Sequence, residues 1–292
     1  MEPPDKVMNF FDENGNPISI LRSEFQTKVI PYNIEKYWDD KNNLRNFAVN
    51  LINEGFYKES YDVSKRLLEL FEHDEGSEVF FGVCLLMLEK WNEAEKHFTK
   101  IIKTFPKSGV SFTNLAKSLM GQGKKEEAIS ELIKGLKLDP NQENGLEWFF
   151  YEMTEEKKEE ELIRTLKELS EIKGAFLPDF YLGLFYLEND LNESLDFFRK
   201  SVQASPENIS LLQMISSELI VKNHLQEAVD LVMPYLNLKS PIPFLTINIA
   251  FALAQLGDIN KALEFLNTQA QFIAPQFKNL LNDAITRINE FK

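Results

Sequence analysis

The sequence predicts an all-α protein, an α-solenoid of about seven helical hairpins that follow one another along the chain. Three observations carry this prediction. Two series of small residues recur about every 34 residues, glycine or proline marks the expected helix ends, and strand-like alternation is confined to about residues 7–21. Helix is therefore expected in well over half of the 292 residues.

Small side chains recur at two positions in each expected hairpin. The first series is Ala48, Gly82, Ala116, Gly183, Ser216 and Ala250, and the second is Ser60, Ala94, Ala128, Ser194, Ala228 and Ala262. Successive members lie 32–34 residues apart once Phe150 and Leu162 are counted as oversized members of the fourth hairpin. A small side chain on each of two helices lets their backbones approach closely, so the period indicates repeated pairs of packed helices.

Glycine and proline stand where such helices must end. A glycine with left-handed backbone is expected at the turn from first to second helix, at Gly55, Gly123 and Gly257. The second helices are expected to stop at Pro106, Pro140 and Pro206, because proline cannot continue a helix.

The fourth hairpin, residues 143–172, departs from this pattern. Phe150 and Leu162 should spread its two helices, and the charged run from Glu155 to Glu161 is expected on its second helix, facing water. Drift in a middle repeat and a deliberate widening of the surface are both open interpretations.

These motifs carry a family resemblance. The pattern Phe81-Gly82-x2-Leu85, followed by Ala94-x3-Phe98 and Pro106, resembles the tetratricopeptide (TPR) repeat. The resemblance extends over roughly residues 41–274. It implies a right-handed superhelix whose first helices line a concave groove that holds peptides or partner proteins.

The first forty residues lie outside the repeats. Asn14-Gly15 stands between two apolar runs and predicts a β-hairpin turn. Ser23-x-x-Gln26 predicts a capping box opening a short helix that ends near Pro31, followed by a second short helix. A hairpin followed by TPR units resembles an uncharacterised group of bacterial TPR proteins, a resemblance that implies no activity.

The two ends are expected to cover the terminal faces of the solenoid. Residues 1–40 form the expected N-terminal cap, residues 41–274 the superhelix, and residues 275–292 a C-terminal capping helix that begins after Pro275. The apolar face of this last helix has helical spacing, at Phe277, Leu280, Leu281, Ala284, Ile285, Ile288 and Phe291.

The composition limits the kinds of partner and the location expected for this chain. A formal net charge of −14 argues against nucleic-acid binding and leaves two interpretations, solubility of an extended surface or a basic partner. No apolar run is long enough to predict a membrane span. The single cysteine, Cys84, fits a buried inert thiol in a reducing compartment, so a cytoplasmic location is expected.

Residues with catalytic chemistry do not form a motif. The histidines His73, His97 and His224 fall in different repeats and none has the spacing of a metal pair. No glycine-rich phosphate loop or nucleophile elbow occurs. We therefore expect no catalytic residue, no metal and no cofactor.

A binding site is predicted on the first helices of the third and fourth hairpins. Its residues are those that the repeat skeleton leaves unexplained, joined by two side chains that TPR geometry turns toward the groove: Thr113, Asn114, Lys117, Asn144, Glu147, Trp148, Tyr151, Phe180 and Leu184. Lys117 would take a carboxylate or a backbone carbonyl, and Trp148 or Tyr151 an apolar side chain. Trp148 as ordinary core between repeats is the open alternative.

The leading hypothesis is a non-catalytic scaffold or adaptor that binds a protein or peptide in its groove. A self-assembling structural protein that uses its terminal caps as interfaces is the alternative, and an enzyme subunit comes third. The sequence identifies neither the partner nor the oligomeric state.

Overall fold

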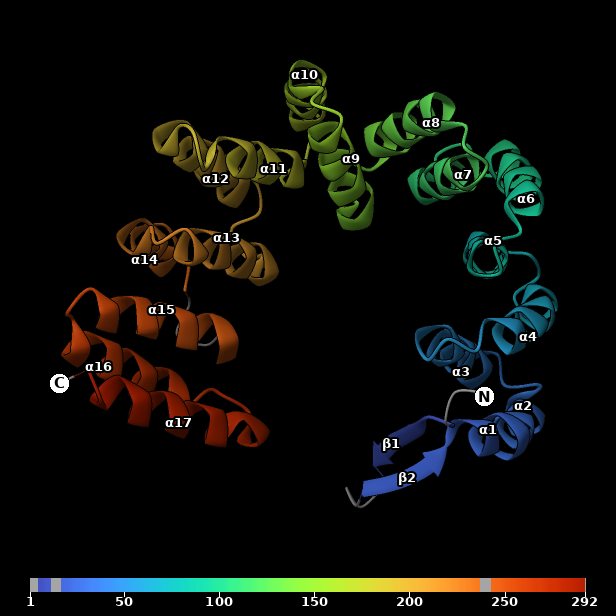
Figure 1. Cartoon of the computed structure of the whole chain (residues 1–292), viewed down its shortest axis with the longest axis horizontal. Coiled ribbons are helices and arrows are strands. Elements are labelled where there is room, and N and C mark those ends of the chain that lie inside the picture. The colour runs from blue at the N-terminus through green and yellow to red at the C-terminus, as the bar shows by residue number, and fades with distance from the viewer. Residues whose placement is uncertain (1–4, 12–16, 237–242, 292) are drawn as a thin grey trace. The chain divides into compact units, whose positions relative to one another are not determined.

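The computed structural model of the chain describes residues 5–11, 17–236 and 243–291. The chain divides into two compact units, Met1–Asp139 and Pro140–Lys292. Within each unit, consecutive helices lie side by side (Figure 1). The predicted all-α fold is confirmed for the described residues, in which α3 to α16 form seven successive helical hairpins. The only strands found there are β1 and β2, within residues 7–21 as predicted.

The first unit contains a β-hairpin, a short helical segment and three helical hairpins. Its elements in chain order are β1 (Val7–Phe11), β2 (Pro17–Leu21), α1 (Arg22–Glu24), the π-helical η1 (Phe25–Val29), α2 (Ile30–Tyr37), α3 (Lys41–Asn53), α4 (Tyr57–Leu70), α5 (Glu75–Met87), α6 (Trp91–Thr104), α7 (Gly109–Gly121) and α8 (Lys125–Leu138).

The second unit contains four helical hairpins and one further helix. Its elements are α9 (Glu143–Glu155), α10 (Glu159–Ser170), α11 (Leu177–Tyr186), α12 (Leu191–Ala204), α13 (Ile209–Val221), α14 (Leu225–Val232), the 3-10 turn η2 (Met233–Tyr235), α15 (Pro243–Gln255), α16 (Ile259–Ala270), the 3-10 turn η3 (Pro275–Phe277) and α17 (Lys278–Asn289).

The small residues of both series lie at the contacts within the helix pairs, as predicted. A Cβ added at Gly82 on α5 would lie 2.4 Å from the Phe98 ring on α6, and one at Gly183 on α11 would lie 2.5 Å from the Phe198 ring on α12. Both rings are fully buried. The Ser194 hydroxyl donates to the Gly183 carbonyl at 2.7 Å. The two helices of a pair therefore touch through backbone and ring with no space for another carbon atom.

Glycine and proline act at the helix ends as the sequence predicts. Gly55, Gly123 and Gly257 have φ values of 76°, 78° and 90° at the turns within hairpins. A side chain is strained in this left-handed region, so glycine is the favoured residue there. The second helices α6, α8 and α12 each end two residues before a proline, at Pro106, Pro140 and Pro206.

The fourth hairpin packs less closely than the hairpins on either side of it in sequence, α7–α8 and α11–α12. Phe150 and Leu162 are both buried at the positions that small residues occupy elsewhere. Their bulk keeps α9 and α10 apart, as predicted. The charged run was placed wrongly, because Glu155 ends α9 and α10 begins only at Glu159. Residues 156–158 of the run therefore form the turn between the two helices.

The N-terminal β-hairpin packs on the first helical hairpin. β1 and β2 pair antiparallel, with Val7 opposite Leu21, while the predicted Asn14-Gly15 turn lies outside the described residues. Met8 and Ile30 share a buried cluster with residues of α3 and of the α3–α4 turn. Arg22 closes this contact, since its guanidinium donates to the Glu54 and Gly55 carbonyls and lies 3.8 Å from the centre of the Phe56 ring.

Pro31 does not end a helix, contrary to the sequence prediction. The helical backbone runs from α1 through η1 into α2, with Pro31 in the first turn of α2. The N–H of Ile30 donates to the Phe25 carbonyl five residues earlier, so the turn before Pro31 is π-helical. A proline ring crowds the carbonyl four residues earlier in an α-helix, and the wider π turn relieves this crowding.

Ser23 does not form the predicted capping box with Gln26. Its backbone N–H and its hydroxyl donate to the Asp5 carboxylate, which precedes the β-hairpin. The Gln26 amide donates instead to the Glu59 carboxylate on α4. Tertiary contacts have replaced the local cap, because partners from other elements satisfy both side chains.

The predicted C-terminal helix is present as α17, after Pro275. It packs on α15 and α16 and buries Leu281, Ala284 and Ile288. Leu280 and Phe291, which the apolar pattern included, stay exposed. A capping role for α17 remains a prediction. Among the described helices, none combines the length and the apolar character that crossing a lipid bilayer requires.

The contact between Gly82 and Phe98 predicts that two glycines of α5 differ sharply in the stability lost when each is replaced by alanine. Gly82→Ala should lower the free energy of unfolding by about 1–3 kcal/mol, because the buried Phe98 ring has no room to move. Gly76→Ala is the control, since its Cβ would meet nothing closer than the Asp74 carboxylate at 3.8 Å. Urea denaturation of both variants measures the difference. Equal stabilities would contradict the packing described here.

Candidate functional site

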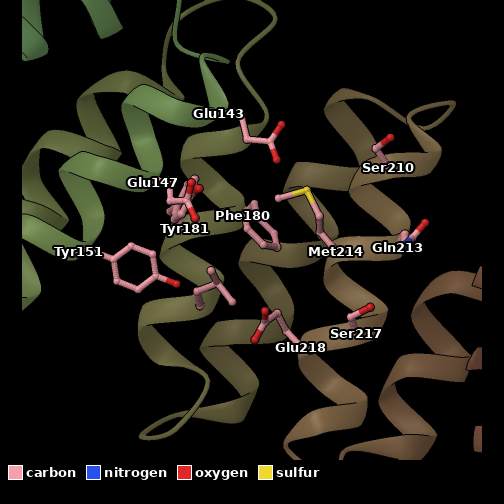
Figure 2. A pocket seen from close by; sticks show the side chains of 11 residues that line it. Glu143, Glu147, Tyr151, Phe180, Tyr181, Ser210, Gln213, Met214, Ser217 and Glu218 are labelled. Atoms are coloured by element: carbon pink, nitrogen blue, oxygen red, sulfur yellow. The ribbon is translucent and has the colours of Figure 1, made fainter. Parts of the chain in front are cut away.

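The described second unit contains a cavity of about 460 Å³ formed by the first helices of three successive hairpins. Figure 2 shows side chains from α9, α11 and α13 around it. Its lining residues are Glu143, Glu147, Tyr151, Phe180, Tyr181, Leu184, Ser210, Gln213, Met214, Ser217 and Glu218. We refer to it below as the α9–α13 pocket.

Helical spacing explains why these residues share one surface. Glu143, Glu147 and Tyr151 follow one another at intervals of four residues on α9, so they lie on one face of that helix. Phe180 and Leu184 on α11 have the same spacing. Because α9 contacts α11 directly, the two faces form adjoining walls of the pocket.

The pocket has an aromatic floor and a carboxylate mouth. Phe180 and Tyr181 are almost fully buried, whereas Tyr151 is 55% exposed. In Figure 2 the Tyr151 ring stands to one side of the cavity, with Glu143 and Glu218 at opposite ends of it. Aromatic side chains beside polar groups at a rim are typical of protein-binding surfaces.

Burial and nearby carboxylates both favour the neutral form of Tyr181 at the floor. Burial raises the pKa of Tyr181 well above its usual value, and the Glu147 and Glu143 carboxylates and Tyr151 raise it further. The phenol therefore stays protonated at neutral pH and can donate a hydrogen bond.

The oversized Phe150 contributes to this aromatic group. Its ring centroid lies 5.2 Å from that of Tyr181 and 5.5 Å from that of Tyr151, and the latter pair meets edge to face. Such contacts add about 0.5–1.5 kcal/mol beyond burial and restrict the orientation of the rings. The residue that spreads the fourth hairpin thus also supports two side chains of the pocket.

The structure brings four of the predicted site residues together. Glu147, Tyr151, Phe180 and Leu184 all line the α9–α13 pocket. The other two predicted residues of α9 do not line it. Asn144 is exposed and Trp148 is half-buried, and both lie on α9 to one side of the face formed by Glu143 and Glu147.

The three predicted residues of α7 belong to the first unit. Thr113 and Asn114 are buried, and the Asn114 amide donates to the Val110 carbonyl of its own helix at 2.9 Å. Lys117 is half-buried, and burial lowers its pKa. A site that joins Lys117 to the residues of α9 spans two units that the structure describes separately, so it stays a prediction.

Sequence reasoning missed five of the pocket residues, Glu143, Tyr181, Ser210, Met214 and Glu218. Tyr181 follows Phe180 directly, and helical spacing does not assign neighbouring residues to the same face, although both line the cavity. The sequence did contain a signal for the residues of α13. Met214 and Glu218 are four residues apart and lie next to Gln213 and Ser217, so they share one side of that helix.

Two histidines that the sequence placed apart meet at one buried carboxylate. His73 Nδ1 lies 2.8 Å from Glu78 Oε1, and His97 Nε2 lies 3.3 Å from Glu78 Oε2 and 2.8 Å from the Glu78 carbonyl oxygen. Both imidazoles are therefore engaged in hydrogen bonds to Glu78. Across the described residues, no group of three or more His, Cys, Asp or Glu side chains is placed to hold a metal ion.

Two family models match the chain, both described as the tetratricopeptide repeat. One matches residues 81–108 and the other residues 111–142, which are the second and third hairpins. The chain therefore contains tetratricopeptide repeats. Outside these matches, the α3–α4 and α11–α12 hairpins show small-residue contacts of the same kind between their paired helices.

Solved structures of other TPR proteins are similar to the chain at low identity. Yeast Tom70 is 17% identical with a TM-score of 0.48, over 90% of this chain and 57% of that one. A thermophilic TPR protein of Thermus thermophilus is 17% identical with a TM-score of 0.41, over 62% and 99% of the two chains. YrrB, described as a TPR protein with an unusual peptide-binding site, is 18% identical with a TM-score of 0.36, over 64% and 97%. This chain thus spans little more than half the length of Tom70. A search of curated proteins gave no match.

Cys84 has the properties of an inert core thiol. It is fully buried, and burial raises its pKa from the ordinary 9.0 to about 11, although Ser60 and Ser64 oppose this through hydrogen bonds. A thiol that stays neutral in the core is a weak nucleophile.

The raised pKa of Cys84 predicts a loss of stability in alkali. Between pH 9 and about 11 the thiol ionises in the unfolded chain while the folded chain keeps it neutral. Stabilisation by this group is therefore complete below pH 9 and falls by about 1.4 kcal/mol per pH unit above it. Urea denaturation of the parent and of Cys84→Ala across this range measures the effect, because other titrating groups cancel in the difference. A difference that does not change with pH would contradict the burial of the thiol.

Proposed function

We propose that this TPR protein is a non-catalytic scaffold that binds an extended segment of a partner protein in the α9–α13 pocket. Proteins with TPR repeats generally serve as scaffolds for protein–protein interaction. The observation that carries the proposal is the cavity of about 460 Å³ on the first helices of three successive repeats.

The composition of the pocket supports a peptide segment as its ligand. Phe180, Leu184 and Met214 offer apolar surface, while Ser210, Gln213 and Ser217 along α13 offer hydrogen-bonding groups. An extended backbone has a polar group at every peptide and side chains on alternating sides, so it needs both kinds of surface along its length. We propose that Lys117 and Trp148 also contribute to binding.

Tyr151 provides the direct test of this proposal. A library of displayed twelve-residue peptides is selected on the full chain, and the affinities of the enriched peptides are then measured for the parent and for Tyr151→Ala. We expect affinity to fall at least tenfold, because exposed tyrosines in binding surfaces often carry much of the binding energy. The melting temperature should change little, since the side chain is 55% exposed.

Tyr32→Ala is the matched control. Tyr32 is 64% exposed on α2 and does not line the α9–α13 pocket. Its removal should leave binding unchanged, and Lys117→Ala reports whether the site extends onto α7. If no peptide is enriched, or if Tyr151→Ala binds every enriched peptide like the parent, the pocket is not the binding surface.

A further inference from the structure

The α9–α13 pocket is lined by three carboxylates and by no basic side chain. Glu143 and Glu147 on α9 form no ion pair within the described part of the chain. Lys222 is one helical turn from Glu218 and interacts with it electrostatically, but its ammonium group forms its ion pair with Glu188 outside the pocket. The mouth of the pocket is therefore a region of excess negative charge, on a chain whose net charge is already −14.

A buried polar residue without a partner lies at the floor of this region. Tyr181 is only 4% exposed, its side chain lines the cavity, and its hydroxyl has no hydrogen-bond partner among the described residues. Because Tyr181 lines the cavity, a ligand that brings hydrogen-bonding atoms to the floor can pair with this hydroxyl. This observation is independent of the carboxylates and points to a polar ligand group deep in the cavity.

The pocket also contains apolar surface. Phe180, Leu184 and Met214 line the cavity together with the polar residues. A long side chain with a methylene stem and a cationic end matches this arrangement, because the stem packs on apolar surface while the charge reaches polar groups. Tyrosine rings attract a cation as well, and Tyr151 and Tyr181 both present rings to the cavity.

We propose that the α9–α13 pocket takes a lysine or arginine side chain of the bound peptide. This inference rests on the proposed function and specifies the ligand of the same site. An apolar side chain is a poorer occupant, because it would exclude water from Glu147 and Glu218 without supplying an opposite charge. An acidic side chain would add a fourth negative charge. The partner segment is thus basic at the position that enters the pocket.

The test uses peptides enriched on the full chain whose binding depends on Tyr151. Each lysine of such a peptide is replaced by norleucine and each arginine by citrulline, which remove the charge at similar size. One replacement should weaken binding to the parent by about tenfold or more, as measured for close charge pairs at interfaces. The double variant E147Q/E218Q should bind the basic peptide about tenfold more weakly and its neutral analogue no more weakly than the parent does.

Two further variants keep the result interpretable. Glu160→Gln removes an exposed carboxylate of α10 that does not line the pocket, and it should bind the basic peptide like the parent. Tyr181→Phe keeps the ring and removes only the hydroxyl, and it should weaken binding several-fold while the fold is retained. Circular dichroism melting of every variant checks the fold.

The outcomes separate this inference from the proposed function. Tyr151-dependent peptides that contain no lysine or arginine would overturn the cationic assignment and leave the binding surface in place. Neutral analogues that bind as well as the basic peptide, together with an unchanged affinity in E147Q/E218Q, would overturn it in the same way. Binding that no pocket variant alters would overturn both.

Discussion

The structure depends on one recurring contact, in which the second helix of most pairs presses against a small residue of the first. Phe98 closes on Gly82 and Phe198 on Gly183, each so tightly that one added carbon atom would overlap the ring. Elsewhere a hydroxyl makes the contact, as where Ser60 donates to the Ala48 carbonyl at 2.9 Å. Repetition of this contact fixes the distance within each hairpin, and so fixes which faces of the first helices remain free for a ligand.

The fourth hairpin shows the effect of relaxing this constraint. Phe150 and Leu162 take both small-residue positions, and α9 and α10 pack less closely as a result. The Phe150 ring then supports Tyr151 and Tyr181 at the pocket. This favours the interpretation of the irregular repeat as a widened binding surface over drift, because the departure from the pattern falls beside the cavity.

The sequence could predict the features that depend on local chain geometry. The period of small residues predicted the helix pairs, and glycines such as Gly123 marked left-handed turns that only glycine adopts easily. The resemblance to the TPR repeat also indicated Glu147, Tyr151, Phe180 and Leu184 as groove-facing residues, and all four line the pocket.

The features that were missed depend on contacts between distant elements. Ser23 bonds Asp5 instead of capping its helix, and a π turn lets the helix continue through Pro31. His73 and His97 meet at Glu78, although no spacing along the chain brings them together. The charge of the pocket escaped prediction for the same reason, since its carboxylates come from α9 and α13.

The central claim is that repeated close packing presents an acidic, aromatic pocket to a basic peptide. A crystal structure of the full chain with a selected lysine- or arginine-containing peptide tests it most directly. The account predicts the cationic group within hydrogen-bond distance of Glu147 or Glu218, its stem against Phe180 and Leu184, and the Phe198 ring still closed on Gly183. A peptide bound on another surface, or one that places an apolar or acidic side chain in the pocket, would contradict it.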